Sequence, residues 1–360
     1  MTGKQKSSSR LVANDRYRGR KKSSTIASPK RGAKGPTKTN FRKPSGSILK
    51  RVSKGLFKLI LRLAWAVLWR GTVIIILMIF LTVTFFAINL PDAANLLDGR
   101  ARGSVTMLDR NGEVFAWRGE QFGGVADAGS VSQKLKNAII ATEDKRFFQH
   151  LGISPRGIAS AIKINLSEGR SALTGHGGST ITQQTAKLLC LGVPYDPNRW
   201  SSERAYESEC RASSLWRKIK EGLYAIAMET KYSKHEILTI YINRAFLGAG
   251  ARGFEAAAQR YFGKSAALVS IPEAAMLAGL LIAPSRYAPT NNLARSRDRA
   301  RMIIALMEDQ GFITKDEAAF ARNNPAELSA AAEARAGGYF ADWVMQSGPS
   351  FFTQNTTEDV

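Results

Sequence analysis

Two glutamates lie in short segments that combine acids with amides, hydroxyls or bases. Glu143 ends an apolar run and is followed directly by Asp144. Glu221 comes much later, and the spacing places Arg217 and Lys218 about one helical turn before it. Two acids far apart in sequence are the minimum set for sugar-transfer chemistry, because one group must move a proton while another stabilises charge. The sequence therefore offers candidates for a glycosyl-transfer site.

Between the two acids, residues 178–184 read Gly-Ser-Thr-Ile-Thr-Gln-Gln. This segment places several hydroxyls and amides at the expected start of a helix. Such groups suit a sugar, whereas the bases beside Glu221 suit a phosphate that leaves with negative charge. Together with an apolar segment at residues 71–91, these residues indicate a transferase for a lipid-phosphate sugar.

Each feature also has a plain structural interpretation. Glu143 could be a solvated acid at a helix end, and Ser179 or Thr180 could be an N-cap. Arg217 and Glu221 could form an ordinary surface pair. The residues alone leave these alternatives open.

The same segments resemble, in order, the motifs of the peptidoglycan glycosyltransferase family, the transglycosylase domain of class A penicillin-binding proteins. The first three motifs, EDxxFxxHxG, GxSTITQQ and RKxxE, match at residues 143–152, 177–184 and 217–221. A fourth matches at residues 234–243, with Ile242 where the family usually has Leu. The resemblance covers roughly residues 135–307 and is that of the N-terminal part of a bifunctional enzyme.

The resemblance implies a mostly helical, lysozyme-like lobe with a smaller membrane-facing jaw, preceded by one transmembrane helix. It implies that Glu143 is the general base, which takes the proton from the 4-hydroxyl of the acceptor lipid II. That hydroxyl would attack, with inversion, a glycan donor on undecaprenyl pyrophosphate, and Glu221 would help to stabilise the donor side. The residues expected to bind the substrates are Asp144, Ser179, Thr180, Gln183, Gln184, Lys187, Arg217, Lys218, Lys234 and Asn243.

Three departures from the family pattern stand out. Arg299 fits the first arginine of the fifth motif, but Ala300 replaces the second. Ser160 stands where the family often has an arginine, so one phosphate contact is expected to be missing. Residues 185–216 form a longer connection than usual and contain both cysteines, which indicates a local insertion.

The resemblance implies no required cofactor, although a divalent cation, Mg²⁺ or Mn²⁺, often assists pyrophosphate departure in the family. The sequence shows no dedicated ligand set for one. Expected partners are lipid II, the growing glycan strand, the membrane and other cell-wall synthesis proteins. Two other functions are weighed: a hydrolase with the same lobe, and a non-catalytic scaffold. The basic residues and the two intact glutamates argue against them.

The charge of +23 over 360 residues is concentrated at the N-terminus. Residues 1–70 hold 20 of the 52 Lys and Arg residues and one acid, Asp15. The rest is nearly balanced, so the chain is not a basic nucleic-acid-binding globule and no nucleic-acid partner is expected for the domain. Residues 1–55 are expected to be a disordered cytoplasmic tail, which either fixes the topology or binds anionic lipid or nucleic acid.

Residues 71–91 contain no charged side chain and are long enough to cross a bilayer. Their distance from the N-terminus favours an uncleaved anchor over a signal peptide. The preceding bases place the N-terminus in the cytoplasm and the later domain outside the bacterial inner membrane. Residues 56–69, which carry Lys58 and Arg62, either extend this helix or lie in the interface.

The remainder divides into a lead-in (92–134), the glycosyltransferase domain (135–322) and a linker (323–360). Alternation around Arg110–Gly112 predicts a hairpin within 104–118. Apolar periodicity predicts helices that begin at 135 and cover 158–166, 215–228, 237–242, 254–262 and 274–282. Residues 169–178 are expected to be a mobile loop, 192–214 to be irregular, and the Ala-rich 323–335 to belong to the linker.

Cys190 and Cys210 either pair in an oxidising compartment or remain free thiols. Residues 338–344 resemble the connector before a transpeptidase domain. No SxxK, SxN and KTG set follows, so no transpeptidase activity is expected from this chain. Whether it is a fragment of a bifunctional protein or a natural short form stays open.

Overall fold

The computed structural model describes residues 47–97, 104–112, 114–119, 121–122, 124–172, 177–212, 214–333 and 343–344. The chain divides into two compact units, Met1–Ala66 and Val67–Val360. The basic tail over residues 1–46 lies outside the described residues, as do most of the predicted connector at 338–344 and residues 173–176 of the predicted mobile loop. The second unit carries the catalytic candidates.

Helix α1 (Ser47–Asn89) contains one segment, Val52–Asn89, that is long and apolar enough to cross a membrane. Residues 56–69 continue the same helix, and whether they cross the membrane or lie in the interface stays a prediction. It ends just before Pro91, whose ring and missing N–H cannot continue a helix.

The end of α1 is fastened to helix α7 (Leu215–Lys231). Lys231 Nζ donates to the carbonyl of Leu90, and the Tyr232 hydroxyl donates to the carbonyl of Pro91. About two turns before Lys231 on α7, the ring of Tyr224 packs edge-on against that of Phe86, with 5.4 Å between centroids. The connection between α1 and the domain is therefore short and held by side chains.

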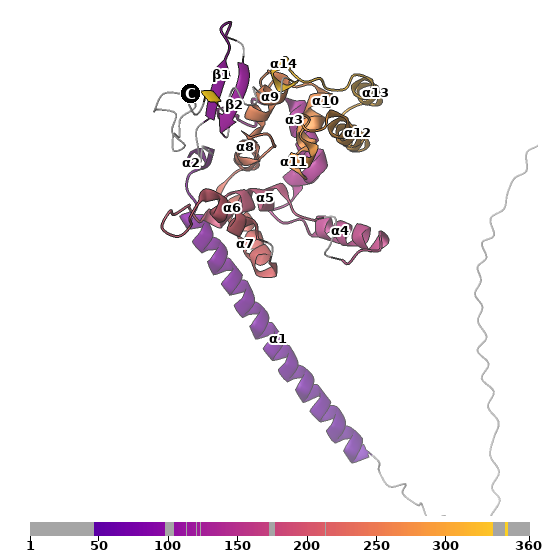
Figure 1. Cartoon of the computed structure of the whole chain (residues 1–360). Helices are drawn as coiled ribbons and strands as arrows, with labels where there is room; N and C mark the ends of the chain where they lie inside the picture. Colours follow the sequence, from indigo (N-terminus) through magenta and orange to yellow (C-terminus); the bar gives the residue numbers. More distant parts are fainter. Residues whose placement is uncertain are drawn as a thin grey trace, which may run out of the picture. The chain divides into compact units, whose positions relative to one another are not determined.

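The described chain is mostly helical, which confirms the predicted fold class (Figure 1). The remaining helices are α2 (Ala93–Leu97), α3 (Gln133–Glu143), η1 (Phe147–Gln149), α4 (Pro155–Ser167), α5 (Ile181–Leu188), η2 (Cys190–Gly192), α6 (Glu203–Arg211), α8 (Lys234–Arg244), α9 (Phe254–Phe262), α10 (Ile271–Gly279), α11 (Pro284–Tyr287), α12 (Leu293–Asp309), α13 (Lys315–Asn323) and α14 (Ala330–Glu333). Each predicted helix is present, but α10 begins and ends earlier than the predicted 274–282. A capping box between Ser270 and Glu273 sets its start.

The predicted hairpin is confirmed by β1 (Ser104–Leu108) and β2 (Val114–Gly119), which pair antiparallel. The Asn111 amide donates to Asp109 Oδ1 over 2.7 Å, and Gly112 supplies the positive φ of the turn. Two short strands, β3 (Gln121–Phe122) and β4 (Ala251–Arg252), pair in parallel.

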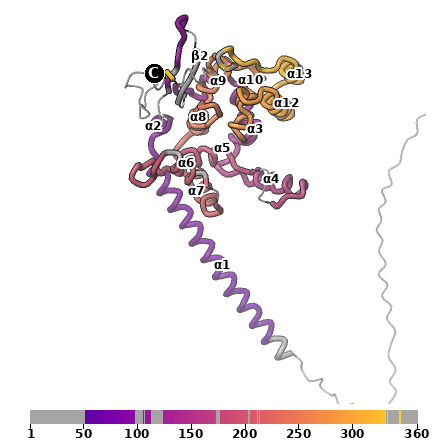
Figure 2. Tube along the Cα trace, viewed as in Figure 1, coloured from indigo at the N-terminus to yellow at the C-terminus, as the bar shows by residue number. Residues whose placement is uncertain are grey.

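Two groups of helices build the core around the candidate site (Figures 1 and 2). In one, α10 packs against α3 and α12, and in the other α5 packs against α7 and α8. The small residues of α10 allow this close packing: a Cβ added at Gly279 would lie 2.9 Å from Arg299 Cγ on α12. The first group thus brings Arg299 close to the core.

Two stretches differ from the sequence predictions. Helix α6 lies inside residues 192–214, so the prediction of an irregular segment is wrong over Glu203–Arg211. Its strongly polar composition conceals the helix, which Ser202 caps by accepting from the Ala205 amide at 3.2 Å. In the predicted linker, α14 packs on α9, and the Ser329 amide donates to the Tyr261 carbonyl over 2.9 Å.

Candidate active site

Glu143 lies at the C-terminal end of α3, where it meets α5. Gln184 Nε2 on α5 donates to Glu143 Oε2 over 2.7 Å. The other end of that amide, Gln184 Oε1, accepts from the Tyr241 hydroxyl on α8 over 3.2 Å. Three helices therefore fix the orientation of one carboxyl group.

The surroundings of Glu143 favour a proton acceptor. Burial raises the pKa of Glu143, and neighbouring Asp144 raises it further. The hydrogen bond from Gln184 and the charge of Arg299 lower the pKa in part. A carboxyl with a raised pKa is a stronger base. Glu143 does lie at a helix end, but it is only partly exposed and Gln184 bonds it, so it differs from a freely solvated acid.

Asp144 joins the first two motifs to each other. Its Oδ2 lies 2.8 Å from His150 Nε2 and accepts from the Ile181 amide at the start of α5 over 3.2 Å. A carboxylate at a helix N-terminus also interacts favourably with the positive end of the helix dipole. In this structure Asp144 therefore holds α5 against the end of α3.

Thr180 and Gln183 close the N-terminus of α5 as a capping box. Gln183 Oε1 accepts from the Thr180 amide over 3.0 Å, and Thr180 Oγ1 accepts from the Gln183 amide over 3.1 Å. Both side chains are buried, and the Thr180 hydroxyl also donates to the Gly152 carbonyl. The N-cap interpretation is confirmed for Thr180, and these two predicted substrate-binding residues have internal partners.

Glu221 is only 1% exposed, so the surface-pair interpretation is wrong. Its Oε2 lies 2.9 Å from Arg217 Nη1 and its Oε1 lies 2.6 Å from Lys218 Nζ. Lys218 Nζ also donates to Ser179 Oγ over 2.6 Å. Arg217 Nε is buried and has no hydrogen-bond partner among the described residues.

The start of α5 is the place where the predicted site residues meet. Ser179, just before the helix, contacts the Glu221 cluster, whereas Gln184 within the helix contacts Glu143. Lys187 follows in the last turn of α5 and is partly exposed. The structure thus gathers both glutamates around one short helix.

Lys234 and Asn243 have internal partners instead. Lys234 Nζ lies 2.7 Å from Glu229 Oε1 and 4.5 Å from the centroid of the Phe147 ring. Asn243 bonds the Ala126 amide and carbonyl at 2.9 and 2.7 Å, and it is 2% exposed. Both residues hold α8 to its neighbours, and their predicted role in substrate binding stays a prediction.

Comparison with known proteins agrees with this geometry. The family model described as "Transglycosylase" matches residues 111–308, more than half of the chain. The chain belongs to the transglycosylase family. The resemblance indicated by the four motifs is thereby confirmed, and all four motifs lie inside the matched range of this transglycosylase.

The relatives of this transglycosylase include longer proteins. Penicillin-binding protein 1A of Aquifex aeolicus is 34% identical over 76% of this chain and 35% of its own length. Penicillin-binding protein 1A of Escherichia coli is 36% identical over 64% of this chain and 24% of its own length. A crystal structure of penicillin-binding protein 1A from Haemophilus influenzae has 23% identity and a TM-score of 0.35, over 63% of this chain and 21% of that chain. The chain spans about a third or less of the length of these relatives.

The transglycosylase site gains two residues that were not predicted as part of it. Tyr241 supports Gln184, and Arg299 acts on the pKa of Glu143. Arg299 Nε has no hydrogen-bond partner among the described residues. The match to the fifth motif was the available signal for Arg299. Ala300, which replaces the second arginine of that motif, is 4% exposed and belongs to the core.

Among the described residues, no group of three or more His, Cys, Asp and Glu side chains could hold a metal ion. A divalent cation for this transglycosylase therefore stays a prediction. The disulfide Cys190–Cys210 is formed, which decides between the two alternatives for the cysteines.

Proposed function

We propose that this transglycosylase polymerises lipid II into peptidoglycan glycan strands. The donor is a glycan on undecaprenyl pyrophosphate, and the acceptor is the 4-hydroxyl of lipid II. The observation that carries the proposal is the carboxyl of Glu143, which is held by Gln184 and has a pKa raised by burial. This is the arrangement that general-base catalysis on a sugar hydroxyl requires.

On the acceptor side, the Glu143 carboxylate takes the proton of the 4-hydroxyl. The hydroxyl oxygen forms a bond to the donor anomeric carbon while the bond from that carbon to pyrophosphate breaks. The displacement inverts the anomeric configuration, so it needs no covalent intermediate and no serine or cysteine nucleophile. The Arg299 charge helps to keep part of Glu143 in its basic form.

On the donor side, Arg217 and Lys218 compensate the charge of the leaving pyrophosphate. Glu221 is buried between them and fixes both cations at 2.9 and 2.6 Å. Preorganised charge costs no reorganisation when the bond breaks. Lys218 also orients Ser179, whose hydroxyl belongs to the same polar surface.

The protein as a whole is proposed to act at the bacterial inner membrane with α1 as a single-pass anchor, an assignment that its apolar length supports. The N-terminal bases support the proposal that the preceding tail is cytoplasmic and the catalytic domain is outside the membrane. Other cell-wall synthesis proteins and a divalent cation remain proposed partners.

Incubation with labelled lipid II tests the function, followed by separation of polymer from monomer. Polymer is expected from the wild type and less than a few per cent of it from Glu143→Gln. Degradation of preformed glycan without polymer would support the hydrolase. No reaction with either substrate would support the scaffold.

A further inference from the structure

We propose that the Cys190–Cys210 disulfide braces the pyrophosphate-holding turn of α7, so that donor binding depends on an oxidised loop. This inference rests on the proposed function. The disulfide loop would act as a positioning element, because neither cysteine contacts Glu143, Arg217, Lys218 or Glu221 in the described structure.

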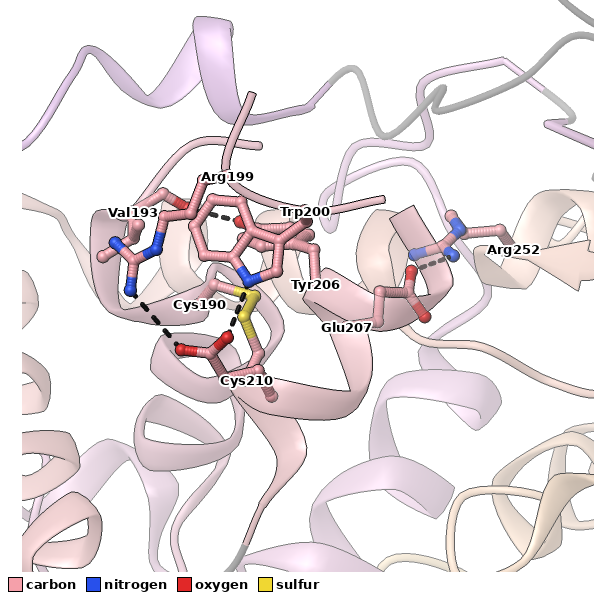
Figure 3. Close-up of a disulfide and its surroundings, with 9 residues drawn as sticks. Cys190, Val193, Arg199, Trp200, Tyr206, Glu207, Cys210 and Arg252 are labelled. Atoms are coloured by element: carbon pink, nitrogen blue, oxygen red, sulfur yellow. Dashed lines mark hydrogen bonds and ion pairs between the residues drawn. A yellow bond between two sulfur atoms is a disulfide. The ribbon is translucent and has the colours of Figure 1, made fainter. Parts of the chain in front are cut away.

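The position of the disulfide in the chain is the first argument. Cys190 follows α5 closely, and Cys210 lies at the end of α6, shortly before α7 begins at Leu215. The bond closes a loop with a sequence separation of 20 residues. The disulfide, drawn in Figure 3, gives a covalent path from α5 to α7 that is much shorter than the path along the backbone. These two helices carry Gln184 on one side and Arg217, Lys218 and Glu221 on the other.

The backbone at Cys190 needs such a restraint. Cys190, Leu191 and Gly192 have φ values of 50°, 56° and 78°, all in the left-handed region. For residues other than glycine this region is unfavourable, so it persists only where neighbouring groups enforce it. The disulfide restrains the first residue of this run, and the Gly192 amide donates to the Leu189 carbonyl over 2.9 Å.

The α6 side of the bond is firmly held (Figure 3). Trp200 is buried and donates from Nε1 to Glu209 Oε2 over 2.7 Å, next to Cys210. The Trp200 and Tyr206 rings pack edge-on, with 4.9 Å between centroids. Glu207 pairs with Arg252 of β4 over 2.8 Å. Helix α6 therefore provides a fixed end for the loop.

The other end of the loop, at Gly192, contacts α7. A Cβ at Gly192 would lie 2.7 Å from the Tyr224 hydroxyl oxygen, so backbone and ring are in close contact. Tyr224 is 3% exposed and lies about one turn after Glu221 on the same helix. Its ring also contacts Phe86 of α1. A movement of the loop therefore reaches the helix that orients Arg217 and Lys218.

Reduction breaks the S–S bond and gives two thiols. The two electrons come from the reductant, a dithiol that becomes a disulfide or a phosphine that becomes a phosphine oxide, and the two protons come from the dithiol or, with the phosphine, from water. The left-handed run can then relax, and the contact of Gly192 with Tyr224 loosens. The donor KM is expected to rise about five-fold or more. The pH dependence of the rate should stay unchanged, because Gln184, which holds Glu143, lies about one turn before the end of α5 and is also bonded by Tyr241 of α8.

The experiment compares the oxidised full chain, the same protein reduced in its folded state, and the double variant Cys190→Ser/Cys210→Ser. A lipid-linked glycan donor and lipid II acceptor are varied independently. The reduced protein and the double variant should share the raised donor KM with an unchanged pH profile. Reductant should leave the double variant unaffected, and reoxidation should restore the wild type. Equal donor KM values before and after reduction would overturn the brace.

A second readout separates this inference from the proposed function. Hydrogen exchange of the amides at 215–221 should accelerate on reduction, whether or not substrate turns over. Polymerisation absent in every state would overturn the proposed function, and the exchange result would still decide on the brace. Unchanged exchange at 215–221 together with faster exchange at 190–211 would show that the disulfide stabilises only its own loop. That result would overturn the proposed brace.

Discussion

Glu143 experiences opposing effects on its pKa, and these predict the pH dependence of the reaction. The base must be ionised, so kcat/KM should rise with pH, with a midpoint above the ordinary glutamate value of 4.5. The variant Gln184→Ala removes a hydrogen bond that lowers the pKa, so the midpoint should move to higher pH. The measurement is the pH profile of kcat/KM for both proteins. A midpoint that moves down would contradict the assignment of Glu143 as the base.

The raised pKa of Glu143 also predicts that its substitution affects activity and stability differently. A folded-state pKa above the unfolded value means that ionisation is less favourable in the folded protein. The free energy of unfolding therefore falls as the pH rises from the unfolded to the folded pKa value. At neutral pH the ionised Glu143 destabilises the folded protein. Glu143→Gln should therefore abolish turnover while the melting temperature at pH 7 stays equal or rises. Calorimetry checks this, and a clearly lower melting temperature would contradict it.

Glu221 differs from an exposed ion-pair partner because its side chain is buried between two cations. An exposed pair contributes about 0–1 kcal/mol, whereas removing a preorganised electrostatic group costs about 100-fold or more in rate. Glu221→Gln is expected to show the larger loss. Lys218→Ala should weaken donor use more than acceptor use, since phosphate is on the donor side.

Polymer yield with donor and acceptor varied independently measures both effects. Glu308→Gln is a matched control, because Glu308 also pairs with an arginine, Arg322 at 2.9 Å, but lies outside the site. Its turnover should stay near that of the wild type. Near wild-type rates for Glu221→Gln would place the second acid elsewhere.

At the scale of elements, the region around α4 exposes apolar side chains. Phe148, Leu151 and Leu166 are 63%, 76% and 58% exposed. Exposed apolar groups with nearby bases are typical of membrane-surface segments. We predict that residues 148–172 contact the bilayer and that their amides gain protection from hydrogen exchange on addition of liposomes.

A paired substitution sharpens this test. Leu151→Ser with Leu166→Ser should reduce the protection that liposomes give to these amides, whereas Phe320→Ser on α13 should leave it unchanged. Phe320 is 69% exposed, so the control removes a comparable apolar surface from another helix. Equal protection at residues 148–172 in the wild type and both variants would argue against the contact.

The sequence predicted the helices and both glutamates well, because amphipathic periodicity and motif order are local signals. It did not reveal what several site residues contact. Thr180 bonds Gly152, Lys234 bonds Glu229 and Asn243 bonds Ala126, all of which are tertiary contacts. Helix α6 was missed because its many charges hide any apolar face. The motifs therefore predicted which residues gather around α5, but they could not indicate which of these residues hold helices in place.

At the scale of the whole molecule, α1 is joined to the domain by a short connection that side chains hold in place. The carbonyls of Leu90 and Pro91 accept from Lys231 and Tyr232 at the end of α7. Insertion of a flexible Gly-Ser segment of about ten residues after Pro91 would allow an end-to-end separation of roughly 15–20 Å. Turnover in vesicles should then fall about three-fold or more, while turnover in detergent micelles should change little. Equal loss in both media would point to misfolding instead.

The fastening of α1 also sets how the enzyme and its substrates find each other. Under the proposed function, the lipid-linked donor and acceptor would move in the plane of the bilayer, and a domain joined closely to a membrane-spanning α1 would sample that same plane. The encounter then becomes a lateral search in two dimensions, governed by surface density and membrane fluidity instead of bulk concentration. Rates should accordingly follow the mole fraction of lipid substrate in the vesicle and stay constant when vesicles are diluted in buffer.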